Sequence, residues 1–193
     1  MHRTDATEAI QEVKDGKAGF FCMVKSTKNC MDWEKRINEL DEQQAVLVRQ
    51  LAVVRNIRKS QIIPEFYYAG QEDFLLQHGE WFAVQPWSYS GFEGPPKCCY
   101  GHSAFLCSLY PQLEYVEGVA LFKECPLMFE HAWVTNAQNE LIDGTWLNVG
   151  RAYLGVRFPL KMITTSLKKS CSVLNNCKDK FALYRKPWTK MNR

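Results

Sequence analysis

The longest regular pattern in the chain is an apolar stripe along residues 32–59. Its hydrophobic members are Trp33, Ile37, Leu40, Leu47, Leu51 and Val54. Three- and four-residue spacing of this kind predicts an amphipathic helix, because such positions lie on one helix face. We favour packing of the stripe against the helix's own domain. A homodimer through a short coiled coil is the alternative, because charged residues flank nearly three heptads.

Shorter patterns predict a helix near the N-terminus and a series of strands after it. Residues 5–15 begin with capping residues and acids and are followed by Gly16, which predicts a short helix. Runs of apolar, β-branched and aromatic residues predict strands elsewhere. These strand-like runs are 18–24, 62–70, 81–87, 114–124, 129–136, 139–146 and two pieces within 149–167.

The segment from about Cys99 to Leu109 is the next predicted helix. Pro95 and Pro96 prevent an earlier start, because proline disrupts a helix interior. The preceding loop, residues 88–96, is rich in Gly and Pro and suits the wall of a substrate groove. A helix followed by successive strands indicates an α+β domain with the helix packed on an antiparallel sheet.

Length and composition predict one globular domain over residues 1–193. Within it we distinguish an N-terminal helical extension at 1–60, a core at 61–165 and a C-terminal segment at 166–193. No apolar run approaches the roughly 20 residues of a membrane-spanning helix, and the N-terminus does not resemble a secretory signal. We therefore expect a cytoplasmic protein with no membrane partner, in which most of the eight cysteines are reduced.

Charge is distributed unevenly behind the net value of +3. Residues 157–193 contain ten Lys or Arg and one acid, whereas the first 156 residues contain fourteen Lys or Arg and twenty acids. Such a basic C-terminal segment predicts an acidic protein partner, a nucleic-acid partner, or docking on the acidic body of the chain itself.

The stretch from 97 to 146 carries the candidate chemistry. Cys99, His131 and Asp143 follow the chain order of thiol-dependent acyl-transfer enzymes. Cys99 begins the predicted helix, where the helix dipole favours a thiolate. His131 begins a strand and suits a general base that later acts as an acid. If the following hairpin is centred on Ala137, His131 and Asp143 lie directly opposite each other, and the carboxylate fixes the imidazole.

Four short motifs in this stretch also resemble a known family pattern. They are Cys99-Tyr100-x-x-Ser103, Tyr115-Val116-Glu117-Gly118, Glu130-His131-Ala132-Trp133-Val134 and Asp143-Gly144-Thr145-Trp146. The series resembles small bacterial and phage-type cysteine proteins with a papain-like or transglutaminase-like core. The resemblance covers a quarter of the chain and implies a nucleophile at Cys99, a base at His131 and an orienting carboxylate at Asp143. Ser103 departs from the family pattern, as does the preceding His102, because the family tends to have Asn-Ala there.

Three further residues are weaker candidates for substrate binding. Glu117 lies on the predicted strand after the nucleophile helix and suits selection of an amine or amide, or simple solvation. Trp133 and Trp146 belong to the two motifs that carry His131 and Asp143.

We therefore expect a cysteine hydrolase or acyl transferase that acts on a protein or peptide through a Cys-His-Asp triad, with no cofactor and no metal. Thiol protease, glutamine deamidase and transglutaminase-like activities, as in a phage protein or a bacterial effector, all fit. One alternative is a zinc module built from Cys98, Cys99, His102, Cys125 and His131, although this ligand spacing is uncommon. The other is a non-catalytic binding protein that holds a protein or nucleic acid through residues 32–59 and the basic C-terminal segment.

Overall fold

The computed structural model describes residues 37–61, 65–84, 90–147, 149–167 and 172–189. The helix expected at 5–15 and the strand expected at 18–24 lie outside these residues. The described part of the chain combines helices with an antiparallel sheet, which confirms the α+β class. None of its helices combines the length and the apolar composition needed to cross a bilayer.

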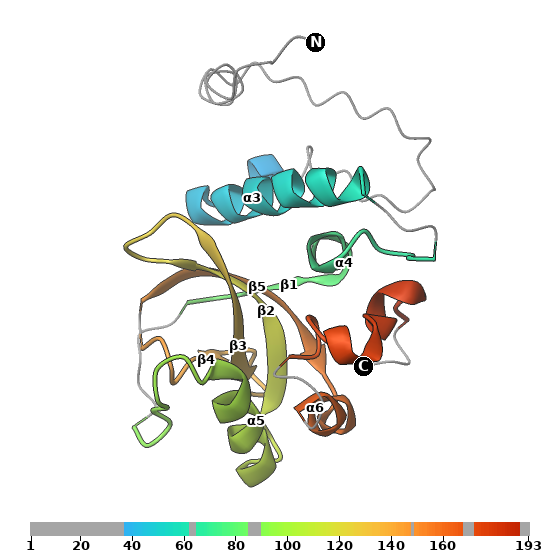
Figure 1. The fold of residues 1–193 in the computed structure, drawn as a ribbon. Helices are drawn as coiled ribbons and strands as arrows, with labels where there is room; N and C mark the ends of the chain where they lie inside the picture. The colour runs from blue at the N-terminus through green and yellow to red at the C-terminus, as the bar shows by residue number, and fades with distance from the viewer. Residues whose placement is uncertain (1–36, 62–64, 85–89, 148, 168–171, 190–193) are drawn as a thin grey trace, which may run out of the picture. The chain divides into compact units, whose positions relative to one another are not determined.

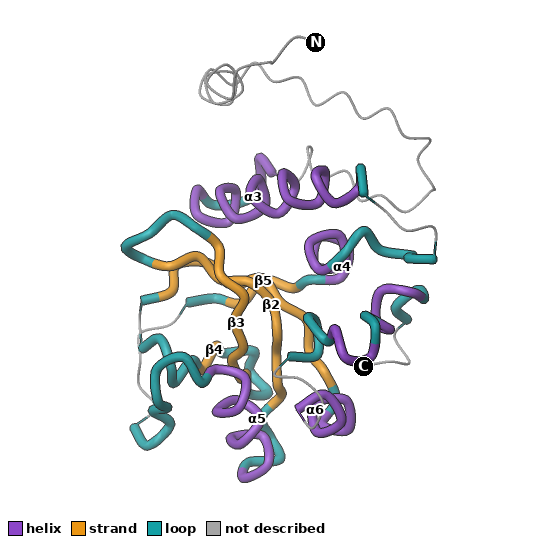
Figure 2. The backbone as a smooth tube through the Cα atoms, in the orientation of Figure 1, coloured by secondary structure: helices purple, strands orange, loops and turns teal. Residues whose placement is uncertain are grey.

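A curled antiparallel sheet forms the centre of the fold (Figure 2). Its strands are β1 (Glu80–Phe82), β2 (Glu114–Phe122), β3 (Met128–Thr135), β4 (Leu141–Ile142) and β5 (Gly150–Phe158). They lie in the order β1-β5-β2-β3-β4, so the long strands β2 and β5 are neighbours at the centre. The predicted strands at 114–124, 129–136 and 139–146 correspond to β2, β3 and β4.

In the described residues, four α-helices and three short 3₁₀ helices surround the sheet. The α-helices are α3 (Glu42–Lys59), α4 (Gln71–His78), α5 (Cys99–Leu109) and α6 (Leu160–Leu167). The 3₁₀ helices are η1 (Ile37–Glu39), η2 (Cys177–Asp179) and η3 (Ala182–Arg185). Figure 1 shows α3 and α4 at one end of the sheet and α5 and α6 at the other. Helix α5 has the bounds predicted from its sequence, and it packs on β3 and β2.

Helix α3 starts later than the apolar stripe suggested, because Asp41 caps it. The Asp41 carboxylate accepts a hydrogen bond from the Gln44 N–H at 2.8 Å, and the Gln44 side chain bonds the Asp41 N–H in return. This reciprocal capping box satisfies two amides that the first turn leaves unpaired. Leu47 and Leu51 are fully buried in the main core. The stripe therefore packs against its own domain, as we favoured.

Side chains of the sheet enter two apolar clusters on its opposite faces, because successive residues of a strand alternate. The main core lies under the helices and includes Val119 and Leu154 of the central strands together with Leu47 of α3. The smaller cluster includes Trp133 and Tyr153. Its remaining members are Phe82, Val116, Ala120 and Leu141, with Trp146 packed against it.

Two of the predicted strands are wrong. Residues 65–70 of the run at 62–70 form turns and bends, and they lead into α4, which the sequence pattern did not predict. Ion pairs from α3 stabilise α4: Arg55 bonds Asp73 at 2.9 Å, and Arg58 bonds Glu72 at 3.1 Å.

The second strand-like piece within 149–167 is helix α6. Pro159 precedes it and has the fixed φ angle that favours a helix start. Ile163 of this helix is buried in the main core, so tertiary packing overrides the preference of its β-branched residues for strands.

The basic C-terminal segment docks on the body of the chain over residues 172–189. Val173, Leu174 and Tyr184 are buried in the main core. The N–H groups of Tyr67 and Tyr68 both donate to the Tyr184 carbonyl, at 2.8 and 3.1 Å. Apolar burial and backbone hydrogen bonds therefore hold this segment in place, together with an ion pair between Arg185 and Glu65 at 3.5 Å.

Candidate active site

The Cys99 side chain lies at the N-terminus of α5. Cys99 is the first residue of the helix, and Cys98, which precedes it, provides no side-chain cap. Cys98 is exposed, whereas Cys99 is 8% exposed and belongs to the main core. The two adjacent thiols therefore differ in environment, and only Cys99 is enclosed by the protein. The first helical turn leaves backbone N–H groups without intrahelical partners, which favours negative charge there.

The His131 imidazole lies on β3 and is hydrogen-bonded to Asp143. His131 is directly opposite Gly118 of β2, which has no side chain to compete for the space. Its Nε2–H donates to Asp143 Oδ2 over 2.7 Å. Both side chains are nearly inaccessible to solvent, at 2% and 4% exposure. The sequence expectation that these two residues meet agrees with this geometry.

The register of the hairpin that brings His131 and Asp143 together differs from the one expected. Val134 pairs with Ile142 and Thr135 with Leu141, so the hairpin is centred on Gln138 rather than on Ala137. His131 and Asp143 are therefore diagonal to each other rather than directly opposed. The cause is the five-residue loop 136–140, in which Asn139 has a φ angle of 65°. The Asn136 carboxamide oxygen accepts from the N–H groups of Gln138 and Glu140, both at 3.0 Å, and stabilises this loop.

The Asp143 carboxylate is held by five hydrogen bonds. Oδ2 accepts from His131 and, at 2.8 Å, from the Tyr153 hydroxyl. Oδ1 accepts from the Thr145 N–H at 3.1 Å, the Thr145 hydroxyl at 3.0 Å and the Trp146 N–H at 3.1 Å. The carboxylate is thus oriented by its own turn on one side and presented to the imidazole on the other.

Lack of space for a side chain explains why the turn after Asp143 contains a glycine, Gly144. A Cβ atom at this position would lie 1.9 Å from the Phe92 carbonyl oxygen. In addition, the Gly144 carbonyl accepts from the Gly94 N–H at 2.9 Å. The loop before α5 and the turn that carries Asp143 are therefore in direct backbone contact, and this contact sets the position of α5 relative to Asp143.

Cys99 completes the arrangement as the second partner of His131. Burial alone would lower the pKa of His131, but hydrogen bonds to Asp143 and to the Cys99 thiol, together with their charges, raise it to about 9. Burial likewise raises the pKa of Asp143, but the hydrogen bond and charge of His131 outweigh this effect and lower it. His131 therefore has two side-chain partners, Asp143 at Nε2 and the Cys99 thiol. The geometry thus brings Cys99, His131 and Asp143 together in one chain of contacts.

Tyr153 was missed by sequence reasoning. It comes from β5, which is separated from β4 and the Asp143 turn by β2 and β3 in the sheet. Its hydroxyl nevertheless reaches Asp143, because the tyrosine side chain is long and the sheet is curled. A weak sequence signal was present: Tyr153 is the polar-tipped residue of an otherwise apolar run, and a buried tyrosine hydroxyl usually finds a partner.

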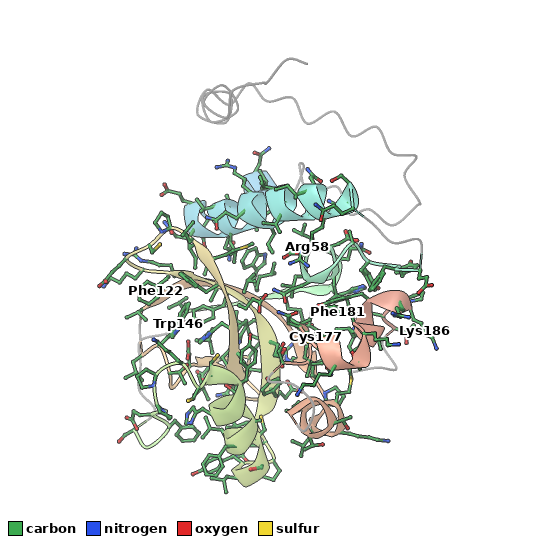
Figure 3. The ribbon with its side chains drawn as sticks, viewed as in Figure 1. Arg58, Phe122, Trp146, Cys177, Phe181 and Lys186 are labelled. Atoms are coloured by element: carbon green, nitrogen blue, oxygen red, sulfur yellow. The ribbon has the colours of Figure 1, made fainter. Side chains whose placement is uncertain are left out.

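The three weaker candidates occupy different environments. Trp146 stacks on His131, with ring centroids 4.1 Å apart, and Figure 3 shows it beside Phe122, 5.2 Å away. It therefore shields the imidazole from water. Trp133 is fully buried against Phe82 and Tyr153, and a Cβ on Gly155 would lie 2.6 Å from its indole ring. Trp133 is therefore a core residue in this structure.

Glu117, the third candidate, is 1% exposed. Its carboxylate accepts hydrogen bonds from Tyr115, Ser172, Val173 and Leu174 of its own chain. The expectation that Glu117 contacts substrate or is solvated on the strand therefore does not describe this structure, in which the oxygens face protein donors.

A pocket of about 490 Å³ lies on the outer side of α5. The loop residues Gly91, Glu93 and Pro95 form one wall. The other wall consists of Cys98, Gly101, His102, Phe105, Leu106, Leu109 and Tyr110. The segment at 88–96 was expected to form a groove wall next to the nucleophile; Gly91, Glu93 and Pro95 of this segment line the hollow, but Cys99 does not. The His102 imidazole is one of these lining groups, and its Nε2–H donates to the Phe92 carbonyl at 2.8 Å.

The described residues give no support to a zinc module. Over these parts of the chain, no three His, Cys, Asp or Glu side chains converge closely enough to hold a metal ion. His102 and His131 both have partners within the protein.

The chain was compared with known proteins in three ways. No protein-family model matches it, no curated protein sequence matches it, and no solved structure matches it. The functional argument therefore depends on the geometry of the site.

Proposed function

We propose that the protein is a cysteine-dependent amide hydrolase or acyl transferase that acts on a protein or peptide through Cys99, His131 and Asp143. One observation carries the proposal: a buried carboxylate fixes one nitrogen of an imidazole that also contacts a thiol at a helix N-terminus. This is the arrangement that activates a thiol as a nucleophile. We propose in addition that the sheet and α5 form a papain-like or transglutaminase-like core, on the resemblance of the motifs.

The roles follow from the contacts. With a pKa of about 9, His131 is protonated at neutral pH, and a cationic imidazole stabilises a neighbouring thiolate. The Cys99 sulfur attacks the carbonyl carbon of the amide, and the carbonyl electrons move to oxygen. The backbone N–H of Cys99 at the start of α5 is our candidate donor to that oxygen. The C–N bond then breaks, and the imidazolium proton passes to the departing nitrogen.

The resulting thioester is resolved by a second nucleophile. Neutral His131 takes a proton from water or from an amine, which attacks the acyl carbon and releases the Cys99 sulfur. Water gives hydrolysis of a peptide bond or deamidation of a glutamine side chain, whereas an amine gives a crosslink. Asp143 keeps the imidazole in one orientation and stabilises its cationic form throughout.

We propose that part of the substrate lies beside α5 in the pocket whose lining includes Cys98 but neither Cys99 nor His131. This pocket is largely apolar and has the volume of a typical ligand site, roughly 300–1,000 Å³. An apolar side chain of the substrate next to the reacting amide would fill it.

We also propose a cytoplasmic location, because the cysteines of the described residues are all free thiols, as expected in a reducing compartment.

Thiol alkylation tests the proposal. The protein is treated with iodoacetamide at pH 6, and peptide mapping by mass spectrometry gives a rate constant for each cysteine. Cys99 should react fastest despite its burial, and the exposed Cys98 is a matched control from the adjacent position. His131→Ala should remove the selectivity. Equal reactivity of Cys98 and Cys99 in the wild-type protein would refute the proposal.

The reaction type is read from the masses of candidate protein substrates after incubation with the enzyme. A split chain indicates proteolysis, exchange of an amide for a carboxyl indicates deamidation, and a joined mass indicates crosslinking. Cys99→Ala is the control and should give none of them.

The basic C-terminal segment supports a secondary proposal, an acidic protein or nucleic-acid partner. Lys178, Lys180, Arg185 and Lys186 lie there at the surface, so their charges are accessible to a partner. Binding that weakens steeply as salt rises would support this partner, because released counterions dominate such association.

A further inference from the structure

Glu117 is a carboxylate buried in the main body of the protein and bonded mostly to one distant segment. It lies on β2 and is 1% exposed. Ser172 donates its hydroxyl hydrogen to Oε2 at 2.7 Å, and the N–H of Leu174 donates to the same oxygen at 2.9 Å. The N–H of Val173 lies 2.8 Å from Oε1 and 2.9 Å from Oε2. Among the described residues, three of the carboxylate's four donors therefore belong to Ser172–Leu174, and the fourth is Tyr115 at 2.6 Å.

The segment Ser172–Asn176, which we name the C-terminal strap, also contacts the neighbours of both reacting residues. The Ser172 hydroxyl hydrogen-bonds the hydroxyl of Tyr100, which follows Cys99 in α5. The side-chain carboxamide of Asn175 donates at 3.4 Å to the carboxylate of Glu130. Glu130 precedes His131 in β3. The strap thus spans from the helix that carries the thiol to the strand that carries the imidazole.

The environment of Cys99 overlaps with that of Glu117. Charges on both residues act on the hydroxyls of Tyr100 and Tyr115, and each raises the pKa of these phenols after the larger effect of burial. Glu117, the two tyrosines and Cys99 are therefore close neighbours. Movement of the strap would therefore change the surroundings of the Cys99 thiol.

A purely structural explanation does not account for the carboxylate. Burying an ionisable group is unfavourable unless several donors satisfy it, and apolar residues of similar volume often serve stability equally well. Glu117 instead fixes the direction of two consecutive backbone N–H groups and one hydroxyl, which an apolar side chain cannot do.

We propose that Glu117 is a positioning residue for the reaction proposed above: by holding the C-terminal strap, it keeps α5 and β3 in register so that Cys99 and His131 stay in contact. The inference depends on that proposed function. Val173 and Leu174, which anchor the strap in the core, supply the remaining rigidity.

The test compares Glu117→Gln with Glu114→Gln, which changes an exposed carboxylate at the start of the same strand. The carboxamide introduced in Glu117→Gln would point N–H groups at the strap's own N–H donors, so the strap should loosen. Two quantities are measured at pH 6 on folded protein: hydrogen exchange at the Val173 and Leu174 amides, and the alkylation rate constant of Cys99. We expect exchange at least about tenfold faster and alkylation about tenfold slower in Glu117→Gln, with neither changed in Glu114→Gln.

The second variant, Ser172→Ala, removes one donor and keeps the carboxylate, so it folds if Glu117→Gln does not. It should slow alkylation of Cys99 by a smaller factor, and Ser108→Ala, in the exposed part of α5, should leave it unchanged. Faster exchange with unaltered Cys99 reactivity would show that the strap is only structural and would overturn the inference. Unchanged exchange in Glu117→Gln would overturn it as well. Absence of selective Cys99 reactivity in the wild-type protein would instead refute the proposed function, whatever the exchange of the strap.

Discussion

Tyr153 and His131 donate to the same oxygen of Asp143, although they come from β5 and β3, which lie on opposite sides of β2. The Tyr153 hydroxyl lies 2.8 Å from Asp143 Oδ2, and His131 Nε2 lies 2.7 Å from it. Two donors on one oxygen fix the carboxylate in both distance and angle. Tyr153 is therefore a member of the site by geometry, which leads to the first prediction.

Tyr153→Phe should lower stability and weaken the selectivity of Cys99. The substitution removes one donor from a buried carboxylate, which destabilises by about 1–3 kcal/mol. Chemical denaturation measures the loss, and alkylation at pH 6 measures the reactivity. Tyr67→Phe, at an exposed position, is the control and should change neither. Equal stability of the two variants would show that the Tyr153 hydroxyl contributes nothing to holding Asp143.

Stability should fall between pH 6.5 and pH 9 because of His131. Its pKa is raised in the folded state from the ordinary 6.5 to about 9, so the folded state holds a proton that the unfolded state releases in this range. The associated stabilisation is on the order of 3 kcal/mol; it is fully present below pH 6.5 and lost as pH rises through 9. Asp143→Asn removes the charge that raises the pKa, so its stability should vary much less over the same range. Denaturation midpoints at several pH values compare the two proteins.

The reaction rate should fall on the alkaline side at the same pKa. Above pH 9, His131 is neutral and has no proton for the departing nitrogen. Once a substrate is known, kcat/KM against pH should show an alkaline limb near pH 9. A limb that stays at the same pH in Asp143→Asn would show that His131 is not the group that titrates.

Gly144→Ala should be strongly destabilising, whereas Gly101→Ala should not. The added methyl group at Gly144 would overlap the Phe92 carbonyl oxygen, so the contact between the loop before α5 and the Asp143 turn must open. We expect a loss of about 2 kcal/mol or more, in the range of severe backbone clashes. Nothing lies within 4 Å of a Cβ at Gly101, where alanine should stabilise α5 by up to about 1 kcal/mol. Thermal denaturation of both variants makes the comparison.

Leu51→Ala and Ile57→Ala test the packing of α3. Leu51 is fully buried in the main core, and its truncation should destabilise by about 2–5 kcal/mol through lost burial and a cavity. Ile57 lies on the exposed side of the same helix, and its truncation should stay within about 0.5 kcal/mol. Similar losses from both would indicate that the outer face of α3 is covered in solution, as a dimer through this helix requires.

The sequence was most informative where local rules decide the structure. Pro95 and Pro96 limited the start of α5, and the runs at 114–124 and 129–136 predicted β2 and β3 close to their observed bounds. The hairpin register was not predicted correctly, because the five-residue loop 136–140 is centred on Gln138, with Asn139 in a left-handed conformation. Moving the centre of the hairpin by one residue moves the position opposite His131 by two, and residues two apart in a strand lie on the same face. His131 and Asp143 therefore still meet.

The remaining errors come from contacts between distant parts of the chain. Helix α4 depends on burial against the core and on ion pairs from α3, and helix α6 depends on burial of Ile163 in the core; short-range patterns contain neither kind of contact. Tyr153 reaches Asp143 across two intervening strands. The hydrogen bonds between Glu117 and the C-terminal strap join residues 55 to 57 positions apart in sequence.

The separation between Glu117 and the C-terminal strap has a consequence for synthesis of the protein. Cys99, His131 and Asp143 leave the ribosome before Ser172, so a growing chain already carries all three reacting side chains while Glu117 still lacks most of its donors. If Glu117 acts as proposed, the thiol gains full reactivity only after the strap has been made and has docked. On this proposal, a chain synthesised only as far as Asp143 would act on amides more slowly than one whose strap has docked.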